Sequence, residues 1–288
     1  MSDAEKAPRA ILAPNPSPLT GRGTNTFLLG HERIAVIDPG PRIASHLQAI
    51  LAAAGKGRIT HIFVTHAHLD HSESARDLAE ATGAPILALG APTAGRSTVM
   101  RRLAESDRIG GGEGLDAAFM PDLTLADGDL IETGEWSLRA IHTPGHFGGH
   151  LAFQQDDRIF CGDLVMGWSS TLISPPDGDL ADYMRSLSRL ASLAPARLLP
   201  AHGDPIEQPL ARLKELALHR RQRTAQILSA LEEGPADAAT LARRIYDIAP
   251  HLLPAAARNV LAHLIALHEL GAVETPQEIS LAARFHRA

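Results

Sequence analysis

Three histidines and one aspartate fall within six positions of the stretch "VTHAHLDH", which covers residues 64–71. Residues i and i+2 of an extended segment project to the same side, so His66 and His68 are placed to bind one ion together. Asp70 and His71 follow where the chain must turn, and from there they can reach a second ion. Imidazole and carboxylate groups suit Zn²⁺, Fe and Mn. The stretch predicts metal binding but is too short to complete two sites.

Further metal-capable side chains follow later apolar runs. "HTPGHFGGH" places His142, His146 and His150 around a Pro-Gly turn, "FCGDLV" contains Asp163, and "LLPAHGDP" contains His202. Each candidate stands at a junction between a predicted strand and a loop. Catalytic side chains are commonly mounted at such junctions on a rigid sheet.

The elements that must position these residues alternate between strands and helices over the first two hundred residues. Amphipathic patterns predict helices at 42–56, 74–83 and 179–193. Short β-branched and apolar runs predict strands at 24–30, 33–40, 58–65, 84–90, 122–125, 129–133, 135–142, 150–154, 157–161 and 197–203. This alternation indicates an α/β fold.

The chain changes character after Pro205. The remaining residues predict three helices and a small β-wing, an arrangement like a winged helix. Such a module can bind nucleic acid, but residues 205–288 hold ten Lys and Arg against nine Asp and Glu. This near-neutral balance favours a structural or pocket-covering appendage over a nucleic-acid reader.

The order of these motifs resembles the metallo-β-lactamase-fold hydrolases: HxHxDH, then HTPGH, then GD, then the late histidine of "PAHG". "NPSPLTGRGTNTFLLG", "VIDPG", "GDLADYMRSL" and "AARNVLAHLIALHELGAV" look like the β-lactamase-like protein 2 subgroup, and together they span nearly the whole chain. The resemblance implies a four-layer αβ/βα sandwich over residues 1–207. It also implies a C-terminal helical, winged-helix-like domain over residues 208–288.

The resemblance further implies a hydrolase with two metal ions and a hydroxide that bridges them, with Asp70 and Asp163 as its catalytic carboxylates. Zinc is the expected metal, and iron and manganese are the alternatives. The implied ligands are His66, His68 and His146 for the first ion, Asp70, His71 and His202 for the second, and Asp163 for both.

Several residues near these motifs have weaker patterns. Asp38 of "VIDPG" is expected to hold a ligand histidine or the motif loop, whereas His61 and Cys161 are expected to be structural. His142 is interpreted equally well as a residue that orients a ligand or as one that braces the turn or faces solvent. His150 is expected to brace the turn or to face solvent. The subgroup often has small or acidic residues after HTPGH, so the sequence "FGG" at 147–149 is expected to alter the pocket wall.

The substrate is left open between an ester or thioester and a phosphodiester, with single-stranded RNA implied by the subgroup. A β-lactam is the weaker alternative, because true lactamases lack the bridging aspartate, and a non-catalytic metal-bound module is the last. The net charge of -6 disfavours RNA, and the cluster Arg220-Arg221-Arg223 is either a basic track or a solvated helix face. A single cysteine, a polar start and the lack of a run of ~18 apolar residues predict a cytoplasmic protein without a membrane partner.

Overall fold

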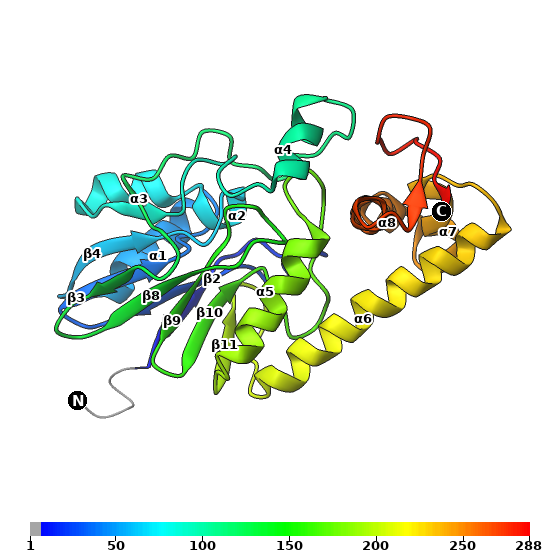
Figure 1. Ribbon diagram of the computed structural model, residues 1–288. Coiled ribbons are helices and arrows are strands. Elements are labelled where there is room, and N and C mark those ends of the chain that lie inside the picture. Colours follow the sequence, from blue (N-terminus) through cyan, green and yellow to red (C-terminus); the bar gives the residue numbers. More distant parts are fainter. Residues whose placement is uncertain (1–6) are drawn as a thin grey trace.

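Two β-sheets stack face to face in the computed structural model, which describes residues 7–288 (Figure 1). The first sheet has six strands in sequential order, and its strands from β3 onward are parallel. A hairpin joins β2 to β3, which pair antiparallel. The strands of this sheet are β1 (Arg9–Leu12), β2 (Asn25–Leu29), β3 (Arg33–Ile37), β4 (Arg58–Phe63), β5 (Ile86–Ala88) and β6 (Leu123–Thr124).

The second sheet has five strands in the order β11-β10-β9-β8-β7. Only β10 and β11 are parallel in it, and the other neighbours are antiparallel. Its strands are β7 (Leu130–Glu132), β8 (Ser137–His142), β9 (Leu151–Gln155), β10 (Arg158–Gly162) and β11 (Arg197–Pro200).

Helices cover the outer face of each sheet, which gives the four layers that the family resemblance implies. Between the sheets, Phe27 meets Phe160 at 5.1 Å between ring centroids, and Phe63 meets Phe153 at 5.2 Å. The first sheet packs against α1 (Ala44–Ala54) and α3 (Ala75–Thr82), and the second against α5 (Leu180–Ser192) and the start of α6 (Pro209–Ala230). Each sheet is therefore buried on both faces, which explains the nearly continuous apolar runs of its central strands.

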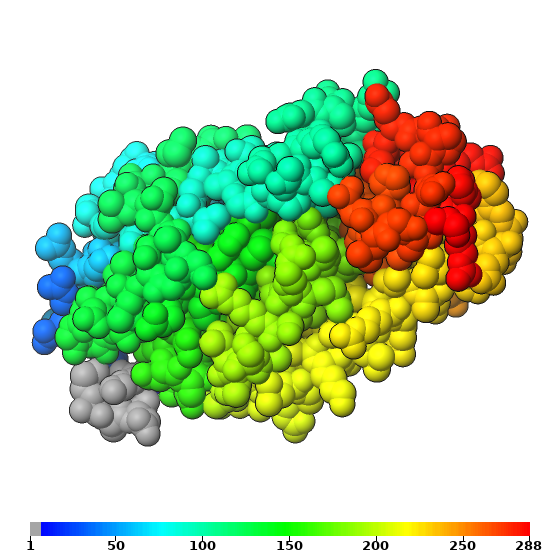
Figure 2. Space-filling view, viewed as in Figure 1, coloured from blue at the N-terminus to red at the C-terminus, as the bar shows by residue number. Residues whose placement is uncertain are grey.

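The C-terminal part has a hydrophobic core of its own. It comprises α6, α7 (Ala238–Ile245), α8 (Leu253–Glu269) and a wing in which β12 (Val273–Glu274) pairs with β13 (His286–Arg287). Met100 and Leu103 of α4 (Thr98–Glu105) join this core, and Figure 2 shows that segment against the C-terminal residues. The winged-helix prediction is confirmed as a fold.

Helix α6 contributes to both halves of the molecule. Leu213 and Leu216 pack with the second sheet, while Ile227 and Ala230 pack in the C-terminal core. One rigid helix thus crosses between the two cores just beyond the predicted boundary at 207/208. The first six residues of the predicted catalytic domain lie outside the described residues.

Candidate metal centre

The ends of several strands meet at one edge of the sandwich, where they gather the candidate ligands. Parallel strands deliver their carboxyl ends to the same edge, and the stretch 66–71 follows β4 directly, with α2 (Leu69–Ser72) forming its last turn. Asp163 follows β10, His202 follows β11, and His146 lies in the turn between β8 and β9. All seven residues that the resemblance implies as ligands lie in this region, and they form groups of converging ligand atoms.

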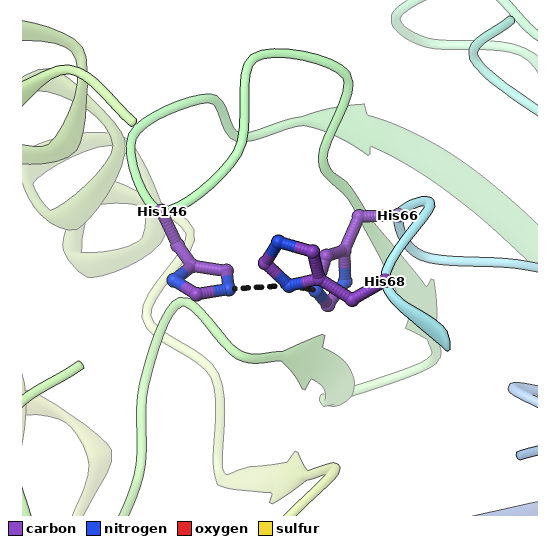
Figure 3. A group of neighbouring side chains, drawn as sticks. All are labelled: His66, His68 and His146. Atoms are coloured by element: carbon purple, nitrogen blue, oxygen red, sulfur yellow. Dashed lines mark hydrogen bonds between the residues drawn. The ribbon is translucent and has the colours of Figure 1, made fainter. Parts of the chain in front are cut away.

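His66, His68 and His146 form the first cluster, and Figure 3 shows their rings turned toward one another. Nδ1 of His68 lies 2.9 Å from Nε2 of His66 and 3.1 Å from Nε2 of His146. Tetrahedral zinc with bonds of about 2.0–2.1 Å to nitrogen separates its ligand atoms by about 3.3 Å. The spacing of these three nitrogens therefore fits a single ion.

Asp70, His71 and His202 form the second cluster. Nε2 of His202 lies 3.2 Å from Asp70 Oδ2, and Nε2 of His71 lies 3.4 Å from the same oxygen. His71 and His202 are almost fully buried, whereas the Asp70 side chain is partly exposed. The cluster is thus open to solvent on the side of its carboxylate.

Asp163 lies between the two clusters. Its Oδ1 is 3.2 Å from His202 Nε2 and 3.5 Å from His71 Nε2, and its Oδ2 is 3.8 Å from His146 Nε2. Oδ1 of Asp163 and Nε2 of His71 are buried without a hydrogen bond to any residue within 7–288. Buried polar atoms rarely stay unsatisfied, and a cation between them would satisfy both. The donor set therefore fits metal, with one oxygen of Asp163 toward each cluster.

Outer hydrogen bonds fix which ring nitrogen faces the clusters. Nδ1 of His146 donates to the Leu172 carbonyl at 2.7 Å, and Nδ1 of His202 donates to the Gly23 carbonyl at 3.2 Å. A carbonyl only accepts, so in the neutral rings the proton stands on Nδ1 and the lone pair of Nε2 points to the cluster. This arrangement is typical of metal-binding histidines.

Asp38 connects one histidine of each cluster. Its Oδ1 accepts the Thr65 N–H at 2.7 Å, and its Oδ2 accepts the Thr65 hydroxyl at 2.8 Å and Nδ1 of His71 at 3.0 Å. The Thr65 hydroxyl lies 3.0 Å from Nδ1 of His66. Asp38 thus holds a candidate ligand histidine, as the sequence analysis expects.

The two clusters differ in their electrostatics. Burial and the neighbouring histidines lower the pKa of His68 to about 3 and that of His66 well below its usual value, so these rings are neutral. Burial opposes charge on His202 as well, but Asp163 and Asp70 outweigh it and raise its pKa to about 10. The same carboxylates raise the pKa of His71. Protons on His71 and His202 would balance the negative charges of Asp70 and Asp163. Divalent cations bound to the same atoms would balance these charges in place of the protons.

Two other histidines of "HTPGHFGGH" hold the turn rather than the clusters. Nε2 of His142 donates to the Gly148 carbonyl at 2.9 Å, so His142 braces the turn. His150 is fully buried, and its Nδ1 lies 2.8 Å from the Thr143 hydroxyl. The solvent-facing alternative for His150 is wrong, because its side chain is fully buried, with its ring centroid 5.3 Å from that of His66.

Three more residues have structural positions. Phe147 is buried, and its ring centroid lies 5.1 Å from that of His68 and 5.6 Å from that of His66. It therefore supports the histidine rings instead of forming an open pocket wall. The ring of His61 packs edge-on against the indole of Trp136. Cys161 is fully buried, and its burial raises the pKa of its thiol.

The segment after Asp163 contributes to the site without any signal in the sequence. Thr171 and Leu172 both contact Nδ1 of His146, yet they have neither a motif nor a periodic pattern. Arg220 of the arginine cluster also differs from both expectations, since it is only 2% exposed and donates to the Thr171 carbonyl. Neither the solvated face nor the basic track describes this arginine.

A four-layer αβ/βα sandwich with histidine and aspartate clusters at one sheet edge defines a class of metal-binding proteins. Residues 19–202 match the model of the metallo-beta-lactamase superfamily, and residues 238–280 match the beta-lactamase associated winged helix domain. The chain belongs to the metallo-beta-lactamase superfamily.

The chain is similar in sequence to known proteins over most of its length. It is 31% identical to the beta-lactamase-like protein 2 homolog of Drosophila melanogaster, over 91% of this chain and 87% of that protein. It is 32% identical to the atrochrysone carboxyl ACP thioesterase of Aspergillus fumigatus, over 77% of this chain and 64% of that protein.

Solved structures extend the likeness to both halves of the molecule. A metallo-beta-lactamase family protein from Thermus thermophilus matches with a TM-score of 0.78 and 28% identity, over 98% of each chain. The protein TTHA1623, crystallised in a di-iron-bound form, matches with a TM-score of 0.53 and 27% identity, over 71% of this chain and 98% of that one.

Proposed function

We propose that the chain is a two-metal hydrolase that cleaves an ester or thioester. This proposal rests on the position of Asp163, whose two carboxylate oxygens face different clusters of converging ligand atoms. When bound there, two divalent ions supply Lewis acidity and lower the pKa of a shared water toward about 7. Zinc is proposed first and iron or manganese second, and the di-iron form of TTHA1623 supports a pair of ions in this fold.

The protein side chains have separate tasks in this proposal. Asp38, Leu172 and Gly23 orient histidine rings through their outer nitrogens. The Thr24 hydroxyl donates to Asp70 Oδ2 at 3.3 Å and keeps that carboxylate turned toward the cluster. The proposed ligands are His66, His68 and His146 for one ion, Asp70, His71 and His202 for the other, and Asp163 for both.

No side-chain nucleophile is assigned. Cys161 lies two residues from Asp163, but it is fully buried and its thiol pKa is raised, so it carries neither access nor a thiolate. The partly exposed carboxylate of Asp70 marks the open side of the site, where an electrophilic carbonyl would approach.

The thioester class is favoured over RNA by charge and by the arginine cluster. The net charge is -6, Arg220 is buried, and Arg223 is half-buried against the ring of Tyr246, so that Arg221 is the exposed member of the cluster. The similarity to a carboxyl ACP thioesterase supports the same class. Single-stranded RNA stays the second candidate, because the match to a beta-lactamase-like protein 2 homolog extends along 91% of the chain.

A parallel assay tests the proposal. Purified protein with measured metal content is given S-lactoylglutathione, bis(p-nitrophenyl) phosphate, a single-stranded RNA oligomer and nitrocefin. We expect thioester hydrolysis, together with its loss in Asp70→Ala and Asp163→Ala. Asp116→Asn is the matched control, because the Asp116 carboxylate accepts a hydrogen bond from the Ser72 hydroxyl and belongs to none of the candidate ligand groups within residues 7–288.

Each outcome of this assay has a consequence. Wild-type rates in Asp70→Ala or Asp163→Ala would refute the two-metal mechanism. Turnover of RNA alone would move the function to the second candidate, and turnover of nitrocefin alone to a β-lactamase. Bound metal without any turnover would favour a non-catalytic binding module.

We further propose that the catalytic domain covers residues 1–207 and the winged-helix domain residues 208–288, and that the protein works in the cytoplasm. None of the helices within residues 7–288 has the length and apolar character that a membrane crossing requires.

A further inference from the structure

A short segment links the C-terminal helices to the first histidine cluster. It runs on from Asp163, and its residues 171–173 lie behind the ring of His146. The Leu172 carbonyl accepts from Nδ1 of His146 at 2.7 Å, and the Thr171 hydroxyl lies 3.1 Å from the same nitrogen. The orientation of His146 therefore depends on how firmly this segment is held.

The C-terminal helices hold the segment at two adjacent peptide units. Arg220 of α6 donates from Nη2 to the Thr171 carbonyl and from Nη1 to Asn259 Oδ1, the latter at 3.3 Å. Asn259 of α8 accepts the Ile173 N–H at 3.0 Å through the same oxygen. Both contacts join parts of the chain that are far apart in sequence.

The planar peptide bond between Leu172 and Ile173 connects Asn259 directly to His146. The Leu172 carbonyl and the Ile173 N–H belong to one peptide unit, which is rigid. Asn259 binds one end of that unit and His146 binds the other. A movement of Asn259 is therefore transmitted to the ring of His146 without a flexible joint in between.

The burial of Arg220 argues that this connection is more than packing. Arg220 is 2% exposed, its guanidinium lies 5.3 Å from the centre of the Tyr183 ring, and no carboxylate within residues 7–288 forms an ion pair with it. A buried charge without an opposite charge is costly, and an apolar residue of similar size would fill the space at lower cost. What an apolar residue would lack is the pair of donors to Thr171 and Asn259.

We propose that Arg220 and Asn259 are positioning residues for the metal centre, because they fix segment 171–173 and through it the ring of His146. The winged-helix domain thereby completes the hydrolase site instead of only covering it. This inference rests on the proposed function, since it assigns His146 to the first ion.

Metal affinity tests the inference independently of turnover. Arg220→Met keeps the apolar stem and removes the donors, Asn259→Leu removes the acceptor at similar size, and Arg221→Met is the control on the exposed neighbouring position. Co²⁺ is titrated against a competing chelator while its visible absorption is recorded. We expect one of two ions to bind about 10–100-fold more weakly in Arg220→Met and Asn259→Leu, with an altered absorption band. Arg221→Met is expected to match the wild type.

Two further variants separate positioning from folding. Arg220→Lys keeps one donor and is expected to recover part of the affinity, which a loss of packing alone would not explain. Combining Arg220→Met with Asn259→Leu is expected to weaken binding by less than the product of the single effects, because both act on one segment. If Arg220→Met does not fold by circular dichroism, Asn259→Leu decides the question.

The failure of this inference differs from the failure of the proposed function. If folded Asn259→Leu and Arg220→Met bind both ions with wild-type affinity and spectrum, the positioning role is overturned. If the wild type itself binds fewer than two ions, the proposed two-metal function fails instead.

Discussion

Replacing Asp38 with asparagine tests the hydrogen-bond network behind the metal centre with almost no change in volume. The amide oxygen can still accept the Thr65 N–H, but the amide nitrogen then faces the Thr65 hydroxyl and Nδ1 of His71. An amide nitrogen only donates. His71 must therefore lose this bond, or carry its proton on Nε2, the nitrogen that faces the cluster.

The expected size of the effect follows from these contacts. Hydrogen bonds to a charged group contribute about 1.5–3 kcal/mol each. Losing a partner that orients a ligand lowers metal affinity about 10–100-fold, which corresponds to about 1.4–2.7 kcal/mol. Because His71 belongs to the second cluster and contacts Asp38 directly, we expect Asp38→Asn to weaken one ion by this factor.

Chelator competition with metal analysis measures this affinity, and the absorption of bound Co²⁺ reports the ligand environment. Asp116→Asn is the control, since the Asp116 carboxylate accepts a hydrogen bond from Ser72 at 2.7 Å and belongs to none of the groups of converging ligand atoms within residues 7–288. Equal affinities of Asp38→Asn and the wild type for both ions would refute the role given to Asp38.

Three further predictions concern other residues. Burial lowers the pKa of His263 to about 3, below the 6.5 of an exposed histidine, so the unfolded chain binds more protons between these values and stability falls as pH falls through that window. At pH 5 this lowers the free energy of unfolding by about 2 kcal/mol. In denaturant unfolding, the free energy of unfolding of His263→Gln should therefore fall less steeply with decreasing pH than that of the wild type. An equal slope would contradict this. Cys161→Ala should keep wild-type turnover, because the thiol is fully buried. For the same reason, the thiol of the wild type should react with a disulfide reagent only on unfolding. An inactive Cys161→Ala variant would instead support Cys161 as a nucleophile. Gly145→Ala should lower the unfolding free energy by at least about 2 kcal/mol, because its Cβ would overlap the backbone of Tyr183. A melting temperature equal to that of the wild type would show that the turn adapts.

Local patterns predict the fold and the candidate ligands well, for a physical reason. Strands buried on both faces are nearly continuous apolar runs, so their ends can be recognised in the sequence. The spacing of "VTHAHLDH" can be interpreted in the same way, because residues i and i+2 share a side of an extended chain. The stretch after β4 is such a case, since His66 and His68 converge on one another there. The family resemblance added the assignment of His146, Asp163 and His202, which spacing by itself left open.

The sequence alone determined the residue types, their places at strand ends and the two-part organisation of the chain, because these depend on short-range periodicity and on motif order. Only the tertiary structure decided that Arg220 is buried, that His150 lies inside the turn, and that Asn259 and His146 hold opposite ends of one peptide unit. An arginine on a helix has the same local pattern whether it faces water or the interior. Its role depends on which distant segment packs against that face, and folding alone brings that segment there.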